Sequence, residues 1–291
     1  MAGVRVPGPG WTDARTTVVG VMGYPVRHSL SPILHNAAFA ALGLNWVSVA
    51  FEVAGGKAAA ALGGMRALGV AGLSVTMPHK ADVAAVVDEC SAVATQLRAV
   101  NCVLNRDGRL YGENTDGAGF LASLARSAHF DPAGKQCLII GAGGAAKAVT
   151  LALADAGAAS VTVVNRTAAR AVDVAVLAGP VGRVGETGAG AVALAAEAEL
   201  VVNATPVGME GSGAPGDGWL IAPSLLHAGQ VVADLVYAPR PTPWLAAAAD
   251  AGARTVDGLG MLVHQAAAQL ELWTGLPAPV DVMWQAAVAV A

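Results

Sequence analysis

The sequence has few charged and few aromatic residues, which make up 13% and 4% of its 291 residues. Seventeen Lys and Arg stand against 21 Asp and Glu, so the net charge is −4, and no run of basic residues stands out. Nucleic acids and anionic membranes are therefore poor partners for this chain. Its 55% content of hydrophobic residues excludes intrinsic disorder. A small metabolite is the expected ligand.

Long apolar runs and paired cysteines are also missing. The longest stretch without a formal charge, residues 30–51, is interrupted by Ser31, Pro32 and Asn36, so we predict no membrane-spanning helix. Residues 1–13 are rich in Gly and Pro and contain no apolar signal-peptide core, so we interpret them as a loose leader. The three cysteines form neither an even set nor a CxxC pair, which indicates reduced thiols in a cytoplasmic protein.

Short Val-rich segments alternate with Ala-rich helical segments along most of the chain, a pattern typical of parallel sheets covered by helices. The predicted strands are residues 16–22, 47–53, 73–76, 100–104, 109–111, 136–140, 161–164, 200–202 and 231–235. We expect Ser31 to cap a helix that starts at Pro32 and ends at Gly43, and Pro78 to open another. Asp107-Gly108 predicts a hairpin. A second unit begins near Asp116, and we expect a helix over 261–273 to fold back on the first.

A glycine-rich turn follows the predicted strand 136–140 and precedes a predicted helix. Its sequence is Gly141-Ala142-Gly143-Gly144-Ala145-Ala146, in which Ala146 stands where the usual pattern has its third glycine. Glycines let the backbone turn sharply and approach a pyrophosphate, which the free N–H groups and the dipole of the helix stabilise. The flanking elements favour a nucleotide site over a simple tight turn. The expected cofactor-binding residues here are Gly141, Gly143, Gly144 and Ala145.

The next predicted strand ends in Asn165-Arg166-Thr167, and Arg170 follows one helical turn later. An NAD site needs an Asp or Glu at this point to hold the ribose 2′-hydroxyl, and none is present. Arg binds a 2′-phosphate in a bidentate fork, whereas a carboxylate would repel it. The alternative, solvated arginines at a helix start, is disfavoured by the helix dipole. We therefore expect NADP(H), bound by Asn165, Arg166, Thr167 and Arg170.

Lys80 lies in the first turn of the helix that we expect Pro78 to open. A cation at the positive end of a helix dipole breaks a local electrostatic rule, and such breaks are commoner at functional sites. The alternative is that Lys80 simply points into water. Asp116, at the start of the next helix, is a candidate partner or an ordinary N-cap. The residues considered so far predict a nicotinamide-linked dehydrogenase. They do not establish that Lys80 and Asp116 act as a catalytic pair.

Metal ligation is not expected. His28 and His35 are seven residues apart but separated by Pro32, and no other group resembles a metal-ligand set.

Several segments together resemble the shikimate dehydrogenase family, in the family's order and from about residue 20 to the C-terminus. They are Gly23-Tyr-Pro-Val-Arg-His-Ser29-Leu-Ser31-Pro32, Ser74-Val-Thr76-Met-Pro-His-Lys80, Ala99-Val-Asn101, Glu113-Asn-Thr-Asp116-Gly, Gly141-Ala-Gly-Gly144, Asn165-Arg166-Thr167, Asn203-Ala-Thr205-Pro-Val-Gly-Met209, Asp257-Gly258-Leu-Gly-Met261 and His264-Gln265-Ala266. One such motif is a weak signal, but the ordered set is highly specific.

The resemblance implies a reversible, NADPH-dependent reduction of 3-dehydroshikimate to shikimate, a step of aromatic amino-acid synthesis. Lys80 and Asp116 match the family's catalytic pair. The positions that match substrate-binding residues are Ser29, Ser31, Thr76, Asn101, Tyr237 and Gln265. The positions that match the surroundings of the nicotinamide are Thr205, Met209, Gly258 and Met261.

The resemblance also implies an α/β fold with two domains. Residues 1–115, completed by 258–291, would form an N-terminal substrate domain, and residues 116–257 a Rossmann-type NADP-binding domain. The C-terminal helix would return to the first domain. We expect a cytoplasmic monomer or homodimer that has no nucleic-acid or membrane partner.

The sequence departs from the family at Ser74, where many relatives have Asn, and at Met77, where Val is frequent. The shorter Ser74 would lose a contact to one substrate hydroxyl or make it through water, whereas Ser31 favours shikimate over quinate. The alternatives are a broader shikimate/quinate dehydrogenase and a non-catalytic, nucleotide-sensing regulator on the same fold. Arg166 speaks against the usual NAD preference of the former, and the presence of Lys80 and Asp116 against the latter. A folate-linked dehydrogenase would not explain Ser29, Ser31 and Gln265.

Overall fold

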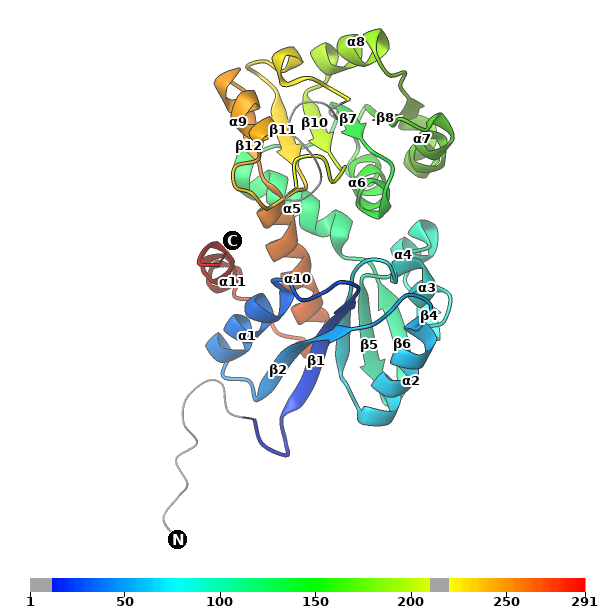
Figure 1. Ribbon diagram of the computed structural model, residues 1–291, viewed down its shortest axis with the longest axis vertical. Coiled ribbons are helices and arrows are strands. Elements are labelled where there is room, and N and C mark those ends of the chain that lie inside the picture. Colours follow the sequence, from blue (N-terminus) through cyan, green and yellow to red (C-terminus); the bar gives the residue numbers. More distant parts are fainter. Residues whose placement is uncertain (1–11, 210–219, 291) are drawn as a thin grey trace. The chain divides into compact units, whose positions relative to one another are not determined.

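The computed structural model of this chain describes residues 12–209 and 220–290. It confirms the α/β class and divides into two compact units (Figure 1). The first unit contains the described residues up to Thr115 together with Ala266–Val290, and the second contains Asp116–Gln265. The chain therefore returns to the first unit inside helix α10 (Gly258–Thr274), eight residues later than residue 258. None of the described helices is long and apolar enough to cross a membrane.

The first unit is built on a mixed sheet of six strands. Their order is β2 (Trp46–Glu52), β1 (Thr17–Gly23), β3 (Gly72–Val75), β5 (Cys102–Arg106), β6 (Arg109–Glu113) and β4 (Glu89–Cys90). Strands β2, β1 and β3 are parallel, β5 runs against β3, and β6 runs against β5. The carboxyl ends of β1, β3 and β6 and the start of β5 therefore lie at one edge of this sheet. The predicted Asp107-Gly108 turn joins β5 to β6, with positive φ angles of 53° and 84°.

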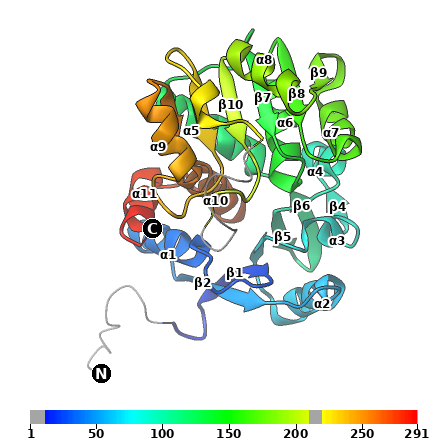
Figure 2. The ribbon, with the colours of Figure 1, turned by 45° about the horizontal axis from the view of Figure 1, so that its top comes forward.

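Helices cover both faces of this sheet. One face packs against α2 (Ala58–Leu68), α3 (Lys80–Ala84) and α4 (Ala92–Leu97) through a core that includes Met22, Leu62 and Val83. Figure 2 shows α1 (Ser31–Ala41, blue) beside α11 (Val280–Val288, red). Trp273 of α10 donates a hydrogen bond to the Val103 carbonyl at 3.1 Å, which fastens the end of that helix to β5.

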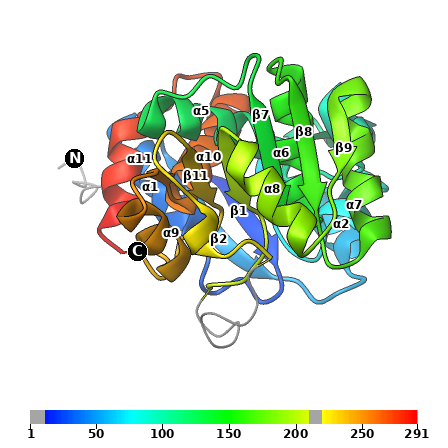
Figure 3. The same ribbon diagram turned by 90° about the horizontal axis from the view of Figure 1, so that it is seen from above.

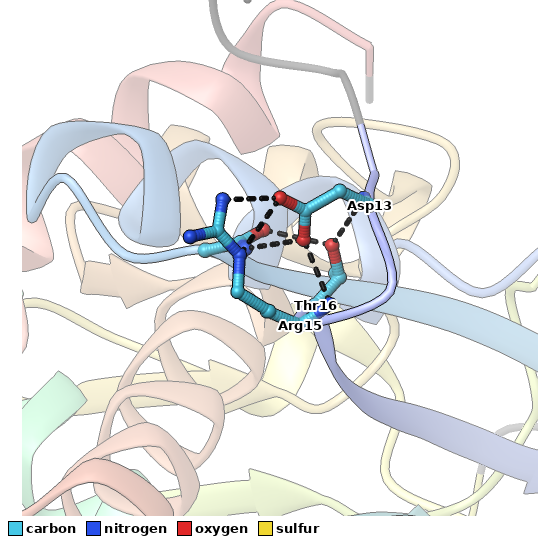
Figure 4. Close-up of polar contacts among 4 residues, drawn as sticks. Asp13, Arg15 and Thr16 are labelled. Atoms are coloured by element: carbon cyan, nitrogen blue, oxygen red, sulfur yellow. Dashed lines mark hydrogen bonds and ion pairs between the residues drawn. The ribbon is translucent and has the colours of Figure 1, made fainter.

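A network of exposed polar groups holds the start of β1 near the start of β2 (Figure 4). The Asp13 carboxylate accepts hydrogen bonds from the backbone and guanidinium of Arg15 and from the Asn45 amide. These bonds, led by that from the Arg15 side chain, lower the pKa of Asp13 to about 2. The Thr16 hydroxyl donates to Asn45 at 2.8 Å. Since the network is exposed, it fixes geometry more than it stabilises the fold.

The second unit is built on a wholly parallel sheet of six strands, several of which Figure 3 shows side by side. Their order is β12 (Arg254–Val256), β11 (Val231–Asp234), β10 (Leu200–Asn203), β7 (Gln136–Ile140), β8 (Ser160–Val164) and β9 (Gly182–Val184). The chain winds outward from β7 to β9, then crosses back to β10 and winds the other way. This is the strand order of a doubly wound dinucleotide-binding fold, whose ligands bind at the carboxyl ends of the strands, where the order reverses.

Alternate residues of β7 enter two separate cores. Cys137 and Ile139 pack against α5 (Asp116–Ala128), α6 (Gly144–Asp155) and α7 (Ala168–Ala175). Leu138 and Ile140 pack against α8 (Ala189–Glu197) and α9 (Pro243–Asp250). Helices therefore cover both faces, which is why the central strands are almost continuously apolar.

Two predicted helix starts are wrong. Helix α1 begins at Ser31 itself, because Leu30 already has helical angles (φ −82°, ψ −11°), so Ser31 is not its N-cap. Pro78 does not open a helix, because the Thr76 carbonyl accepts the His79 N–H at 3.1 Å and places Pro78 in a turn. Helix α3 begins two residues later, at Lys80, and has five residues.

Other elements were missed or shortened in the sequence-based prediction. Strands β4, β9 and β12 have only two or three residues each, too few for a recognisable alternation. Helix α5 starts at Asp116, as expected.

Candidate active site

The candidate residues of the first unit gather at one edge of its sheet. Ser29 and Ser31 follow β1, Thr76 and Lys80 follow β3, and Asn101 directly precedes β5. The loops after β1 and β3 are tied together, because Thr76 N–H donates to the Met22 carbonyl and Tyr24 N–H to the Met77 carbonyl, both at 2.9 Å. Topology therefore brings these five residues to the same edge.

The two serines contact each other. Their hydroxyl oxygens are 3.3 Å apart, and the Ser31 N–H donates to the Ser29 Oγ at the same distance. Ser31 is buried, whereas Ser29 is half-buried. Ser31 is therefore not the cap of α1, whereas the Ser29 hydroxyl accepts the N–H of the first residue of this helix. Both are short donors that a polar ligand could engage.

Lys80 is the first residue of α3 and is half-buried. Its carbonyl accepts the Val100 N–H at 2.9 Å, so its backbone is held beside the residue that precedes Asn101. Helix α3 has little more than one turn and therefore only a small dipole, which weakens the electrostatic argument made from the sequence. The position of Lys80 next to Asn101 is the stronger structural observation.

Asn101 belongs to a buried network of three side chains. Its Oδ1 accepts the Thr115 N–H at 2.8 Å, and its Nδ2 donates to the Thr115 hydroxyl at 3.0 Å. Gln269 of α10 donates to the Asn101 carbonyl at 3.1 Å. Thr115 and Gln269 were not identified from the sequence, since only the fold shows that residues 101, 115 and 269 meet. The network fixes the Asn101 amide in one orientation.

Asp116 and Gln265 lie in the second unit, on neighbouring helices. Asp116 is the buried first residue of α5, with 5% of its surface exposed. One turn later, a Cβ added at Gly119 would lie 2.6 Å from the Gln265 nitrogen, so glycine is what allows α5 and α10 to approach so closely. Gln265 donates to the Leu262 carbonyl at 2.9 Å. The start of α5 and the Gln265 turn of α10 thus form one rigid pair.

The glycine-rich turn joins β7 to α6 as predicted. Gly141 has a φ of +112°, and a Cβ there would lie 2.9 Å from the Thr205 Cγ2, so only glycine fits. A Cβ at Gly143 or Gly144 would meet nothing within 4 Å. The turn is therefore closed on the side of β10 and open above the start of α6, where free N–H groups could hold a pyrophosphate.

The residues expected to bind a 2′-phosphate follow β8. The Asn165 amide donates to the Thr167 carbonyl at 3.0 Å and closes the turn into α7. Arg166 and Arg170 are both exposed. Neither guanidinium has an ion pair or hydrogen bond within the described part of the chain. Two cations at a helix start, with no carboxylate pairing them, are suited to a dianionic ligand.

The remaining predicted cofactor residues, and the predicted substrate-binding residue Tyr237, also lie at the carboxyl edge of this sheet. Thr205 and the exposed Met209 follow β10, and the half-buried Tyr237 follows β11. Burial raises the pKa of Tyr237. A Cβ on Gly258 would lie 2.2 Å from the Leu235 carbonyl, so glycine is required there too. Met261 is half-buried and packs on the core beneath the edge.

Neither metal ligation nor a disulfide is found within the residues that the structure describes. No group of three or more His, Cys, Asp and Glu side chains there could hold a metal ion. Cys90, Cys102 and Cys137 are free thiols, and burial raises the pKa of each, to about 12 for Cys137.

Family profiles match three parts of the chain. The shikimate dehydrogenase substrate binding domain matches residues 21–103, shikimate / quinate 5-dehydrogenase matches 123–207, and the shikimate 5′-dehydrogenase C-terminal domain matches 258–288. A shikimate dehydrogenase (NADP(+)) of Moorella thermoacetica is 48% identical over 93% of this chain and 92% of its own. The chain belongs to the shikimate dehydrogenase family. A second shikimate dehydrogenase (NADP(+)), of Methanopyrus kandleri, is 45% identical over 94% of this chain and 96% of its own.

Solved structures of the shikimate dehydrogenase family have the same fold. A shikimate dehydrogenase in complex with NADP+ has a TM-score of 0.88 at 34% identity, covering 96% of this chain and 97% of its own. The Thermus thermophilus enzyme with NADP(H) and shikimate has a TM-score of 0.84 at 36% identity, covering 94% and 100%. A quinate dehydrogenase of Corynebacterium glutamicum with NAD has a TM-score of 0.86 at 32% identity, covering 94% and 99%. The predicted family and fold class are confirmed.

Proposed function

We propose that the chain is an NADP-dependent shikimate dehydrogenase that reversibly reduces 3-dehydroshikimate to shikimate in aromatic amino-acid synthesis. The proposal rests above all on Arg166 and Arg170 after β8, at the edge of a doubly wound sheet, since no described carboxylate pairs with either of them in this chain of the shikimate dehydrogenase family. This observation supports a dehydrogenase and the choice of cofactor together.

The second unit fits NADP. Gly143 and Gly144 leave open the space that a pyrophosphate needs, and Arg166 and Arg170 supply the charge for the 2′-phosphate. Thr205, Met209, Gly258 and Met261 would surround the nicotinamide. We therefore assign cofactor binding to the second unit, which carries Gly258 and Met261, and substrate binding chiefly to the first unit.

The bound cofactor supplies the hydride when 3-dehydroshikimate is reduced. As the ketone carbon gains that hydride, its oxygen develops negative charge, which the Lys80 ammonium stabilises. Lys80 then gives its proton to this oxygen, which becomes the new hydroxyl. Asp116, which matches the other member of the family's catalytic pair, would orient the ammonium. In the reverse direction Lys80 takes the proton back.

Substrate recognition needs several short donors and acceptors, because the substrate is a polyhydroxylated acid. Ser29 and Ser31 would hold its carboxylate, and Thr76, Asn101 and Gln265 its hydroxyls. Tyr237 would be a further contact. The network that fixes Asn101 supports this assignment, because a preset amide rejects analogues with a misplaced hydroxyl.

A broader shikimate/quinate dehydrogenase is the second candidate. It is favoured by Ser74, which is buried in β3 where many relatives have Asn, and by the likeness to a quinate dehydrogenase. The arginine pair argues against the NAD named for that neighbour. For the protein itself we propose a cytoplasmic location and a monomer or homodimer without nucleic-acid or membrane partners, in keeping with its net charge and free cysteines.

The test is a reaction with defined products. Purified protein incubated with 3-dehydroshikimate and NADPH should consume the two in equal amounts, and NMR should identify shikimate as the product. Failure to consume either compound, or a product other than shikimate, would refute the proposed activity. Lys80→Met, which keeps the length of the side chain without its charge, is the matched control for contaminating activity.

A further inference from the structure

One buried carboxylate has no role in the reaction described above. Asp234 is the last residue of β11 and has 1% of its surface exposed. Its Oδ1 accepts hydrogen bonds from the Asn203 amide at 2.9 Å and from the Val236 N–H at 3.1 Å. Its Oδ2 accepts the Thr242 hydroxyl at 2.7 Å. It therefore connects the ends of β10 and β11 and the start of α9, where Thr242 is the N-cap.

The contact with Asn203 extends towards the cofactor site. The Asn203 Nδ2 donates to Asp234 at 2.9 Å and, less closely, to the Val207 carbonyl at 3.3 Å. Its Oδ1 therefore faces Thr205 and accepts both the hydroxyl, at 2.6 Å, and the N–H, at 3.1 Å. The Thr205 hydroxyl in turn accepts the Val207 N–H at 3.2 Å. A chain of hydrogen bonds thus runs from Asp234 through Asn203 and Thr205 to Val207, in the loop after β10.

This loop also faces the glycine-rich turn. The Thr205 Cγ2 lies 2.9 Å from the position of a Cβ on Gly141, and the Ala204 carbonyl oxygen lies 3.0 Å from it. A rotation of Thr205 would therefore change the gap between the loops after β7 and β10. That gap is where the strand order reverses and where a dinucleotide binds in this fold.

We propose that Asp234 is a positioning residue for the nicotinamide half of the cofactor site, because its carboxylate sets the orientation of Asn203 and, through it, of Thr205. The inference rests on the proposed function, since it assumes that the loop carrying Thr205 faces the nicotinamide. Asp234 itself touches neither cofactor nor substrate.

The charge on Asp234 changes within the range of an ordinary assay. Burial raises its pKa to about 6, and the three hydrogen bonds only partly offset this rise. The charged group that adds to the rise is Asp257, which is paired with Arg240 at 2.6 Å. Above this pKa the carboxylate holds Asn203 as a charged acceptor. Below it the neutral acid holds Asn203 less strongly, and NADP should bind less tightly.

The experiment compares two ligands across pH. NADP and 2′,5′-ADP share the 2′-phosphate, which itself titrates near pH 6, but only NADP carries the nicotinamide. The ratio of their affinities, measured by calorimetry between about pH 5 and pH 7.5, therefore cancels the phosphate titration. In the parent protein we expect NADP to lose about tenfold relative to 2′,5′-ADP as pH falls through this range.

Asp234→Asn is the decisive variant, because it imitates the neutral acid at every pH. In this variant the ratio of the NADP affinity to the 2′,5′-ADP affinity should not change with pH. It should equal the ratio that the parent protein shows at the lowest pH measured. Gln230→Ala is the control, since Gln230 is equally buried just before β11, at the end away from Asp234, and its side chain bonds to α8 and the loops beside it. It should lower stability but keep the parent's pH dependence.

Three results would overturn the inference. They are a parent ratio that does not change with pH, an Asp234→Asn ratio that still changes, and a Gln230→Ala ratio as flat as that of Asp234→Asn. The parent ratio needs no variant, so the inference stays testable if Asp234→Asn does not fold. Absence of 2′,5′-ADP binding by the parent would instead refute the NADP site of the proposed function.

Discussion

Reversing the charge of Arg166 should convert the cofactor preference of this protein. Arg166 is exposed at the turn after β8, and the described residues place no carboxylate against it. A charge-assisted contact between a guanidinium and a phosphate contributes about 1.5–3 kcal/mol, and the exposure of this site points to the lower value. Arg166→Asp removes this contact and adds a repulsion of about 1 kcal/mol at 4 Å in water. The sum is about 2.5 kcal/mol, or roughly seventyfold in kcat/KM for NADP.

The assay follows the reduction of NADP and of NAD with shikimate as the second substrate. Arg166→Asp should lose NADP activity by this factor while its NAD activity stays equal or rises, because the new carboxylate can hold a free 2′-hydroxyl. Arg170→Ala should show a smaller loss. Arg183→Asp is the control, since Arg183 is an exposed residue of β9 and its replacement makes the same change in net charge.

The reasoning would be refuted by equal losses with NADP and NAD in Arg166→Asp, which would indicate a damaged fold rather than a lost phosphate contact. It would also be refuted if Arg183→Asp lost as much NADP activity as Arg166→Asp, because the effect would then come from net charge alone.

Four further predictions concern single residues. Lys80→Ala should lower kcat by about 10²–10⁴-fold with little change in KM, and stopped-flow traces that show near-normal turnover would remove it from proton transfer. Ser29→Ala and Gln265→Ala should each raise the KM for shikimate by the equivalent of about 0.5–3 kcal/mol, and unchanged shikimate affinity in calorimetry would contradict their assignment. Gly143→Ala should keep or slightly raise Tm, because its Cβ meets nothing within 4 Å, yet weaken NADP binding; tight NADP binding by this variant would be the contrary result. The pKa of Asp234 rises on folding from 3.8 to about 6, so the parent protein should lose stability as pH rises and this carboxyl group is forced to ionise in its buried site. In urea titrations the free energy of unfolding of Asp234→Asn should therefore gain about 3 kcal/mol relative to that of the parent between about pH 4 and pH 8. A difference that is the same at every pH would contradict this.

Features set by local sequence were predictable. The Asp107-Gly108 hairpin and the Gly141–Gly144 turn depend on backbone angles that few other residues adopt, so the residue types alone predict them. Arg166 and Arg170 were identified because the position of the cofactor's 2′ group in this fold is known, at the end of the strand after the glycine-rich turn. The charge of the residues there indicates whether that group is a hydroxyl or a phosphate. The core strands of the second unit were found because both faces are covered and the runs are apolar.

Features set by tertiary contacts were not predictable. The Asn101–Thr115–Gln269 network joins residues that are up to 168 positions apart. In the sequence, Asp234 is simply the polar residue at the end of an apolar strand. Only the fold shows that the side chains of Asn203 and Thr242 both donate hydrogen bonds to it. The helix start at Ser31 depends on the backbone of Leu30, which no cap residue signals.

One crossed assay decides whether this protein is an NADP-dependent shikimate dehydrogenase. Initial rates are measured with shikimate and with quinate, each with NADP and with NAD, and kcat/KM is compared across the four combinations. The account predicts the highest value for shikimate with NADP, with NAD lower by one to two orders of magnitude, in keeping with contacts of about 1.5–3 kcal/mol. A higher kcat/KM with NAD than with NADP, or with quinate than with shikimate, would contradict it.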